Sequence, residues 1–136
     1  MNIVKVFESA FNQMKVKGWD KIYVLVDIHD TIFKASYHNE TFEWVGNAKQ
    51  VLQMMSQRDD IYLILWSGSW NEWLNRYNRK LIDNGIIFDE VCTNSEVQSS
   101  DLYCSENKIY FNVGIDDRFG FEPEDWDLIM EFLNNK

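Results

Sequence analysis

Each of three short apolar runs in this sequence is followed by polar residues. Their types are those found in catalytic and metal-binding sites. Asp27-Ile-His29-Asp30-Thr31 follows the first run, Ser67-Gly68-Ser69 the second, and Asp116-Asp117-Arg118 the third. A lone Asp after a strand is usually a turn or cap residue, so each set alone is weak evidence. Two adjacent carboxylates repel each other unless a cation or a proton separates them. The Asp116-Asp117 pair therefore favours a functional site.

The apolar runs have the composition of strands that are buried on both faces. Residues 22–27 and 61–66 are continuous, apolar and rich in β-branched side chains, which is typical of a parallel sheet. A shorter strand is predicted over 86–91, and a last strand leads into Gly114. Ligands of open parallel sheets bind beyond the carboxyl ends of the strands, so the three polar sets are expected to meet there.

Helices are predicted between these strands. Apolar residues recur at helical spacing over 3–17, and Gly18 ends that segment. Further helices are expected over 45–58 and 70–84, and a final helix is expected with Pro123 in its first turn. Residues 32–45 suggest a hairpin or flap, and 96–107 a loop. The pattern predicts one α/β domain over 1–136, a three-layer sandwich around a parallel Rossmann-like sheet, with helix 1–18 packed on the core.

Charge and composition limit the classes of partner. The chain of 136 residues has a formal net charge of −9, and its basic residues are scattered except for the group Arg76, Arg79 and Lys80. This balance argues against extended nucleic acid, although not against a nucleotide or a strand end. No secretory signal or membrane span is recognised, and Cys92 and Cys104 are expected to be reduced. A cytoplasmic protein is therefore predicted.

The spacing of the polar sets resembles the four motifs of the haloacid-dehalogenase-like (HAD) superfamily. Residues 24–31 resemble the first motif, hhhhDxDxT, and residues 63–67 resemble the second, hhhh[ST]. Lys108 corresponds to the lone lysine of the third, and residues 113–117 resemble the fourth, hhhhDD. The resemblance covers nearly all of the chain after the first helix. It is similar to small capless members, including the phosphatase half of polynucleotide kinase-phosphatases and small proteins of tailed bacteriophages.

The resemblance implies a magnesium-dependent phosphomonoester hydrolase that forms an aspartyl-phosphate on Asp27. Ser67 and the following amides, including that of Gly68, would hold the phosphoryl oxygens. Lys108 would neutralise charge on the nucleophile and the phosphate. The implied Mg²⁺ ligands are the carboxylate of Asp27, the backbone carbonyl of His29 and the carboxylate of Asp117, with Asp116 close by.

His29 departs from the family pattern, which has a second Asp at this position. That Asp protonates the leaving group and later activates water. Strand periodicity places positions 27 and 29 on the same side, so His29 is expected to replace the Asp as acid and base. The alternative is a structural His in a slow or inactive enzyme. His38, in the predicted flap, receives no role beyond a substrate contact.

Lys108 imposes a geometric condition on the last strand. If 109–115 were fully extended, Lys108 would lie about 23 Å from Asp116. A catalytic Lys108 therefore requires a bend over 108–112 and a short strand. Lys80 is the alternative lysine, although its helix pattern suggests that it faces solvent.

The spacing between motifs leaves no room for a cap domain, which favours an open site. A nucleotide or a nucleic-acid terminal phosphate is the preferred substrate, and Trp44, Trp66, Trp70 and Phe119 lie near the motifs and could stack a base. A homo-oligomer would also be compatible with an open site. A phosphate-binding protein without efficient turnover is the main alternative. A receiver-type signalling domain is disfavoured because its acidic pair follows the first strand, whereas here the pair comes last.

Overall fold

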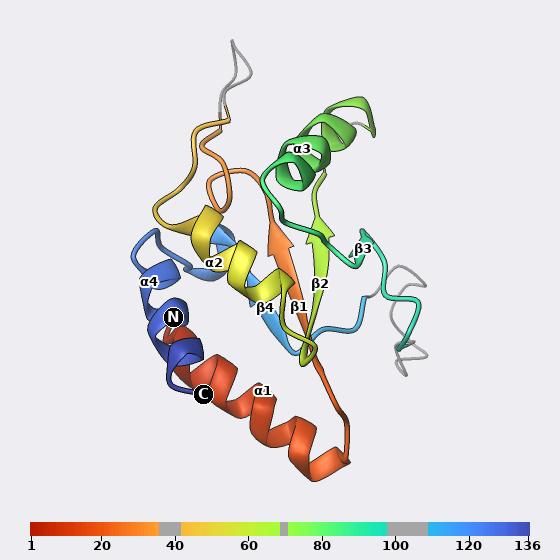
Figure 1. Ribbon diagram of the computed structural model, residues 1–136, viewed down its shortest axis with the longest axis vertical. Coiled ribbons are helices and arrows are strands. Elements are labelled where there is room, and N and C mark those ends of the chain that lie inside the picture. Colours follow the sequence, from red (N-terminus) through yellow and green to blue (C-terminus); the bar gives the residue numbers. More distant parts are fainter. Residues whose placement is uncertain (36–41, 69–70, 98–108) are drawn as a thin grey trace.

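The computed structural model describes residues 1–35, 42–68, 71–97 and 109–136 (Figure 1). Its strands form a four-stranded parallel sheet with the order β3-β2-β1-β4. The strands are β1 (Ile22–Asp27), β2 (Ile61–Trp66), β3 (Glu90–Val91) and β4 (Val113–Ile115). The predicted class, an α/β fold with a parallel Rossmann-like sheet, is confirmed.

Four α-helices accompany the sheet in the described part of the chain, close to the predicted ranges. They are α1 (Ile3–Lys17), α2 (Ala48–Ser56), α3 (Asn71–Asp83) and α4 (Asp125–Asn134). Gly18 ends α1 with a φ of 69°, a left-handed conformation that glycine adopts without steric cost. Pro123 lies in the turn just before α4 rather than in its first turn. No helix among the described residues is long and apolar enough to cross a membrane.

All four helices contribute side chains to one buried cluster, which includes alternate residues of the strands. Its members include Phe7 and Phe11 of α1, Val51, Leu52 and Met55 of α2, Leu74, Tyr77 and Leu81 of α3, Trp126 and Ile129 of α4, and Val24, Val26, Leu63 and Leu65 of the sheet. The first helix is thus packed on the core, as the spacing of its apolar residues predicts.

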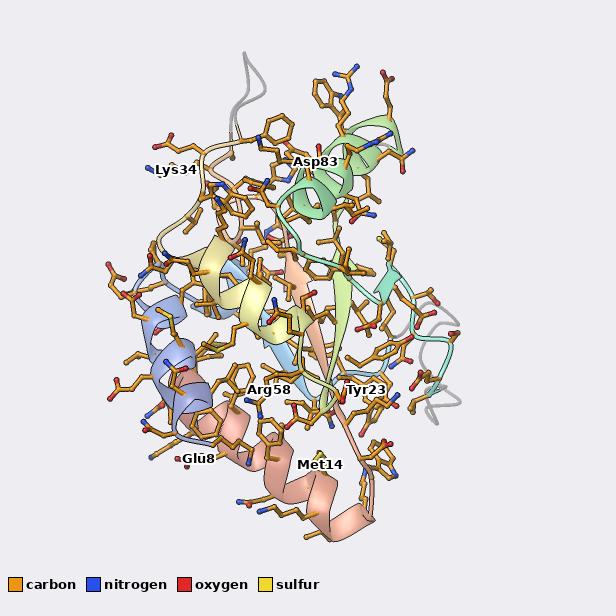
Figure 2. The ribbon with its side chains drawn as sticks, viewed as in Figure 1. Glu8, Met14, Tyr23, Lys34, Arg58 and Asp83 are labelled. Carbon is orange, nitrogen blue, oxygen red and sulfur yellow. The ribbon has the colours of Figure 1, made fainter. Side chains whose placement is uncertain are left out.

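The intervening strand residues face the other way and form a second, smaller cluster. Tyr23, Leu25 and Ile64 are buried there against Trp19, Val97, Ile109 and Tyr110. Tyr23, labelled in Figure 2, makes edge contacts with the rings of its neighbours and donates its hydroxyl to Glu96 at 3.1 Å. In the described residues this layer therefore consists of loop segments rather than a helix.

The strand order explains why residues 97, 109 and 110 lie on the face of the sheet that carries the second cluster. β2 and β3 follow one another on one side of β1, whereas β4 lies on its other side. The chain must therefore cross the sheet between β3 and β4. The connection from β3 to β4 runs in the sense opposite to the earlier connections, from β1 to β2 and from β2 to β3. If it is right-handed, it therefore passes over the face opposite to α2 and α3. The packing of residues 97, 109 and 110 on Tyr23 and Leu25 agrees with this rule.

The third strand is shorter than predicted, because its first residues find other hydrogen-bond partners. A strand over 86–91 was expected, but β3 comprises only Glu90–Val91. The backbone N–H of Ile87 donates to the Ser56 hydroxyl at 2.9 Å, and the Asp89 carboxylate accepts from the Leu63 N–H at 2.8 Å. These side chains replace the backbone partners that a longer strand would need.

The last strand is also short, which is one part of the condition that a catalytic Lys108 requires. Asn112 lies in a bend, and β4 begins at Val113. The Asn112 side chain accepts from the Tyr23 N–H at 2.8 Å, so a side-chain oxygen takes the place of a backbone carbonyl. Lys108 itself lies outside the described residues.

The predicted flap begins as a hairpin. The Lys34 N–H donates to the Glu43 carbonyl at 2.9 Å, and the Val45 N–H donates to the Ile32 carbonyl at 2.8 Å. Phe33 and Trp44 form an antiparallel bridge between these bonds. Residues 36–41, with His38, lie outside the described residues.

Candidate functional site

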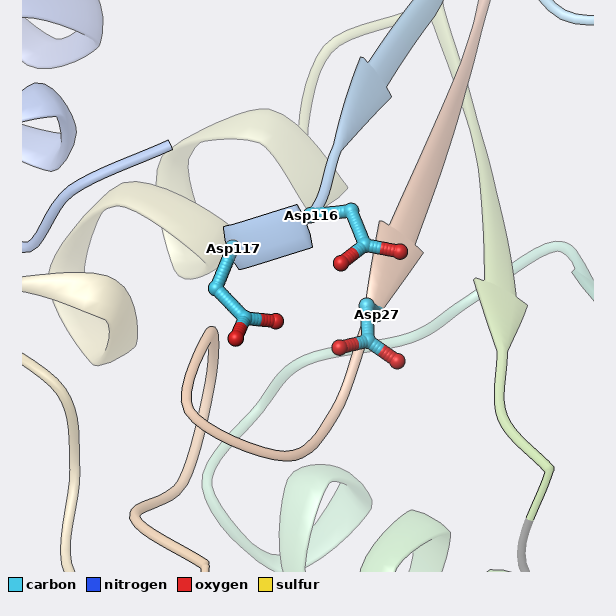
Figure 3. Close-up of side chains that lie close together, drawn as sticks. All are labelled: Asp27, Asp116 and Asp117. Carbon is cyan, nitrogen blue, oxygen red and sulfur yellow. The ribbon is translucent and has the colours of Figure 1, made fainter. Parts of the chain in front are cut away.

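Three carboxylates converge at the carboxyl end of the sheet (Figure 3). Asp27 is the last residue of β1, and Val26 before it pairs with Ile115, so Asp116 follows directly alongside. One carboxylate oxygen from each of Asp27, Asp116 and Asp117 lies within 4.8 Å of the other two. The structure thus brings together residues from the first and last polar sets, as the position of strand ends predicts.

Thr31 connects the first part of this cluster to the last. Its side chain is fully buried, and its hydroxyl lies 3.5 Å from Asp27 Oδ2, to which it donates. The same hydroxyl accepts from the backbone N–H of Asp117 at 3.1 Å. The Thr31 carbonyl accepts from the indole N–H of Trp126 at 3.0 Å. Thr31 therefore holds the two acidic segments at a fixed spacing.

A tight turn after β1 returns Thr31 to the cluster. The Ile28 carbonyl accepts from the amides of Thr31, Ile32 and Phe33 at 2.9 to 3.3 Å. Asp30 completes the turn with a φ of 58°, a left-handed conformation that Asp tolerates better than most residues. The Asp30 carboxylate accepts from the Ala35 N–H at 3.0 Å. Asp30 therefore serves the turn, and its side chain is exposed.

Replacing Thr31 by Val tests how much the Thr31 hydroxyl contributes to the stability of the fold. Valine keeps the shape but leaves the partly buried Asp117 amide without its acceptor, which costs about 0.5 to 1.5 kcal/mol of unfolding free energy. Thr31→Ser retains the hydroxyl and should recover most of this loss. Urea unfolding of both variants gives the comparison. Equal stability of wild type and Thr31→Val would contradict the role of the hydroxyl.

Asp116 and Asp117 are oriented by a short 3₁₀ helix that follows β4. This helix comprises Asp117–Phe119, and Asp116 caps it by accepting from the Arg118 N–H at 2.9 Å. One Asp116 oxygen is therefore committed to the backbone. The adjacent acidic residues thus point into the site from two different backbone positions.

Burial and like charge change the ionisation of the cluster. Burial, together with the nearby charge of Asp116, raises the pKa of the Asp27 carboxyl from 3.8 to about 7. Burial also raises the pKa of Asp116, and Asp117 adds to this effect. Three close carboxylates thus repel one another when all are ionised. A bound cation would remove this repulsion.

The donor set fits a hard divalent cation such as Mg²⁺. Carboxylate and carbonyl oxygens are the ligands that this ion prefers. Asp27, Asp116 and Asp117 supply carboxylate oxygens. No hydrogen bond from a described residue occupies the carbonyl oxygen of His29, so the implied fourth ligand is not used elsewhere.

The raised pKa of Asp27 makes stability depend on pH when no cation is bound. The unfolded chain releases this proton near pH 3.8, whereas the folded protein keeps it to about pH 7. The stability contributed by the proton is fully present below pH 3.8 and is lost as the pH rises through 7. Because Asp27 is half-buried and solvent screens its charge, the loss is expected to be about 1 to 2 kcal/mol.

Thermal unfolding in chelator should therefore show a melting temperature that falls between about pH 5 and about pH 8. Adding Mg²⁺ at the higher pH should restore it. Asp116→Asn should weaken both responses, because it removes one charge and one ligand, whereas the exposed Asp59→Asn should keep them. A Mg²⁺ response that survives Asp116→Asn and Asp117→Asn together would contradict the metal assignment.

The predicted phosphate-holding residues follow β2. Ser67 is half-buried, and its carbonyl accepts from the Cys92 thiol at 3.7 Å. A Cβ added to Gly68 would meet nothing within 4 Å, so the space beside it is open. Ser69 lies outside the described residues. The alternative lysine, Lys80, has its ammonium group 5.5 Å from the centre of the Phe42 ring, over the base of the flap.

His29 is held by a residue that the sequence did not single out. Its Nε2 lies 3.2 Å from the hydroxyl of Tyr77 in α3, and the two rings meet edge to face. Tyr77 is buried and stacks on Phe33 at the flap base. Its helical spacing with Leu74 and Leu81 indicates an inward side chain, but nothing local identifies His29 as its partner.

Comparisons with known proteins support the fold. A solved structure of a conserved protein from Bacteroides thetaiotaomicron is similar, with a TM-score of 0.65 and 26% sequence identity. The match covers 85% of this chain and 91% of that protein. Its description names no activity or ligand. Searches against protein-family models and curated proteins gave no match.

Proposed function

We propose that this protein is a magnesium-dependent phosphomonoester hydrolase that transfers the phosphoryl group to Asp27. The convergence of Asp27, Asp116 and Asp117 at one end of the sheet carries the proposal. Thr31 adds support, because it links Asp27 to the backbone of Asp117. These residues stand at the positions where the sequence resembles the HAD superfamily.

Asp27 would act as the nucleophile. A carboxylate oxygen attacks phosphorus, the bond from phosphorus to the ester oxygen breaks, and the leaving oxygen takes a proton from His29. His29 then accepts a proton from water as the water attacks the aspartyl-phosphate, which releases phosphate and restores Asp27. Bound Mg²⁺ would neutralise the negative charge of the phosphate and the carboxylates.

Other residues would bind and orient the phosphate. Ser67 and the backbone around Gly68 follow β2, beside the end of β1, where they would hold the phosphoryl oxygens. Lys108 stays the proposed countercharge, and the short β4 supports it, because a long final strand would carry that lysine away from Asp116. The absence of a cap-sized insertion in the sequence supports an open site.

The test is phosphate release from p-nitrophenyl phosphate and a panel of nucleotides. We expect turnover with Mg²⁺, loss of turnover in EDTA, and recovery when excess Mg²⁺ is added. The exposed Asp59→Asn provides a matched carboxylate control that should keep wild-type activity. A folded protein that releases no phosphate from any substrate would refute the proposal.

A phosphate-binding protein without turnover is the second candidate. The contact between His29 and Tyr77 favours this candidate, because one of the two ring nitrogens of His29, Nε2, already has a partner. Such a protein would bind inorganic phosphate in a Mg²⁺-dependent manner, measurable by calorimetry, and would release none from esters.

A further inference from the structure

The aromatic residues near the motifs differ in what their rings already contact. The Trp44 ring packs on Phe33 with 4.6 Å between ring centres, so it belongs to the flap base. The Phe119 ring lies against Gly114, where an added Cβ would come within 2.9 Å of it. Trp70 lies outside the described residues. Trp66 and the 52% exposed Phe119 remain open to a substrate, and Trp66 is the one that pairs in register with Asp27.

Trp66 lies directly beside the proposed nucleophile. It is the last residue of β2 and pairs in register with Asp27, the last residue of β1. Neighbouring strands lie about 4.8 Å apart, and paired residues of parallel strands project from the same face of the sheet. Asp116 follows Ile115 on the other side of Asp27. Asp27 is therefore flanked by the acidic pair on one side and by an indole on the other.

The Trp66 side chain is more exposed than the strand that carries it. Leu63, Ile64 and Leu65 are fully buried, whereas Trp66 is 38% exposed. Within the described residues, no ring packs against this indole and no hydrogen bond involves it. An open aromatic surface beside a polar site is suited to stacking on a planar ring.

We propose that Trp66 stacks on the base of a nucleotide whose phosphate lies at Asp27. This inference rests on the proposed function and narrows its substrate class to phosphomonoesters in which a short linker, such as a ribose, joins the phosphate to a planar ring. The formal charge of −9 fits a single nucleotide better than a long nucleic acid. Trp66 is thus a specificity-determining residue.

Steady-state kinetics with Mg²⁺ test the inference. The substrates are adenosine monophosphate, which has a base, and ribose phosphate, which lacks one. Trp66→Ala should lower kcat/KM for adenosine monophosphate about 10- to 100-fold, the loss that one stacked base predicts. It should leave kcat/KM for ribose phosphate within about twofold. Trp66→Phe keeps an aromatic face and should retain most of the preference.

Trp73→Ala is the matched control, because Trp73 is 39% exposed on α3 and its ring is covered by the Arg76 guanidinium at 4.8 Å. This variant should keep the wild-type preference. Equal losses on both substrates in Trp66→Ala, or an unchanged preference, would overturn the inference while leaving the hydrolase intact. If Trp66→Ala fails to fold, Trp66→Leu decides the question, because it keeps apolar bulk without an aromatic face and should lose the preference as well.

Binding separates this inference from the proposed function. If the wild type releases no phosphate, the hydrolase proposal fails, and calorimetry with the same two ligands and Mg²⁺ then tests stacking. Tighter binding of adenosine monophosphate than of ribose phosphate, reduced in Trp66→Ala, supports the inference. Equal affinities overturn it.

Discussion

Asp27→Asn is expected to reduce phosphate release by about 10⁴-fold or more, because the amide cannot attack phosphorus and binds a cation poorly. The variant should fold. At neutral pH without metal it should even be more stable than the wild type, since it removes a half-buried charge that Asp116 repels. Activity and unfolding measured on one preparation would therefore move in opposite directions.

A loss of activity together with a gain in stability distinguishes a nucleophile from a residue that supports the fold. A residue needed only for folding would lose stability and activity together. Activity that persists in Asp27→Asn at a level above about one hundredth of the wild type would rule out phosphoryl transfer to Asp27. Asp30→Asn is a useful neighbour control, because Asp30 is exposed and its Oδ1 accepts from a backbone amide, which an asparagine oxygen can also do.

His29→Ala is expected to lower kcat by about 10²- to 10³-fold on alkyl phosphates. The loss should be much smaller on p-nitrophenyl phosphate, whose leaving group departs without a proton. A larger loss on alkyl phosphates than on p-nitrophenyl phosphate indicates general acid catalysis. If His29 only supported the fold, the two losses would be equal. His29→Asp restores the residue that the HAD pattern has at this position and should recover part of the alkyl phosphate activity.

Tyr77→Phe provides the companion variant for His29. It removes the hydroxyl that contacts Nε2 and keeps the ring that packs on Phe33. If His29 moves protons, Tyr77→Phe should change kcat on alkyl phosphates more than KM. Equal losses on both classes of ester in His29→Ala would show that His29 has no acid role.

Local patterns predicted the central elements well. β1 and β2 are continuous apolar runs, and their observed bounds equal the predicted ones, 22–27 and 61–66. Their carboxyl ends mark where a parallel sheet binds ligands, so the sequence alone predicts that Asp27 and Asp116 lie close together.

The edges of the sheet could not be predicted in the same way. Asp89 and Asn112 use side-chain oxygens to accept from the amides of Leu63 and Tyr23. These partners are distant in sequence, so no local pattern reveals where the strand pairing stops. The Thr31 contact with Asp117 spans 86 positions, and that between His29 and Tyr77 spans 48. Such contacts depend on the packed tertiary structure.

The lengths of the strands also bear on how the protein behaves at high concentration. The two inner strands have 6 residues each, whereas the edge strands β3 and β4 have 2 and 3. Within the described residues, another chain would therefore find little exposed backbone with which to extend the sheet, and Glu90 and Asp116 add charge at those edges. Short, charged edges hinder the strand-to-strand association that begins aggregation. The edge strands that the structure describes therefore give each copy little means of adding strands to its neighbours in a crowded solution.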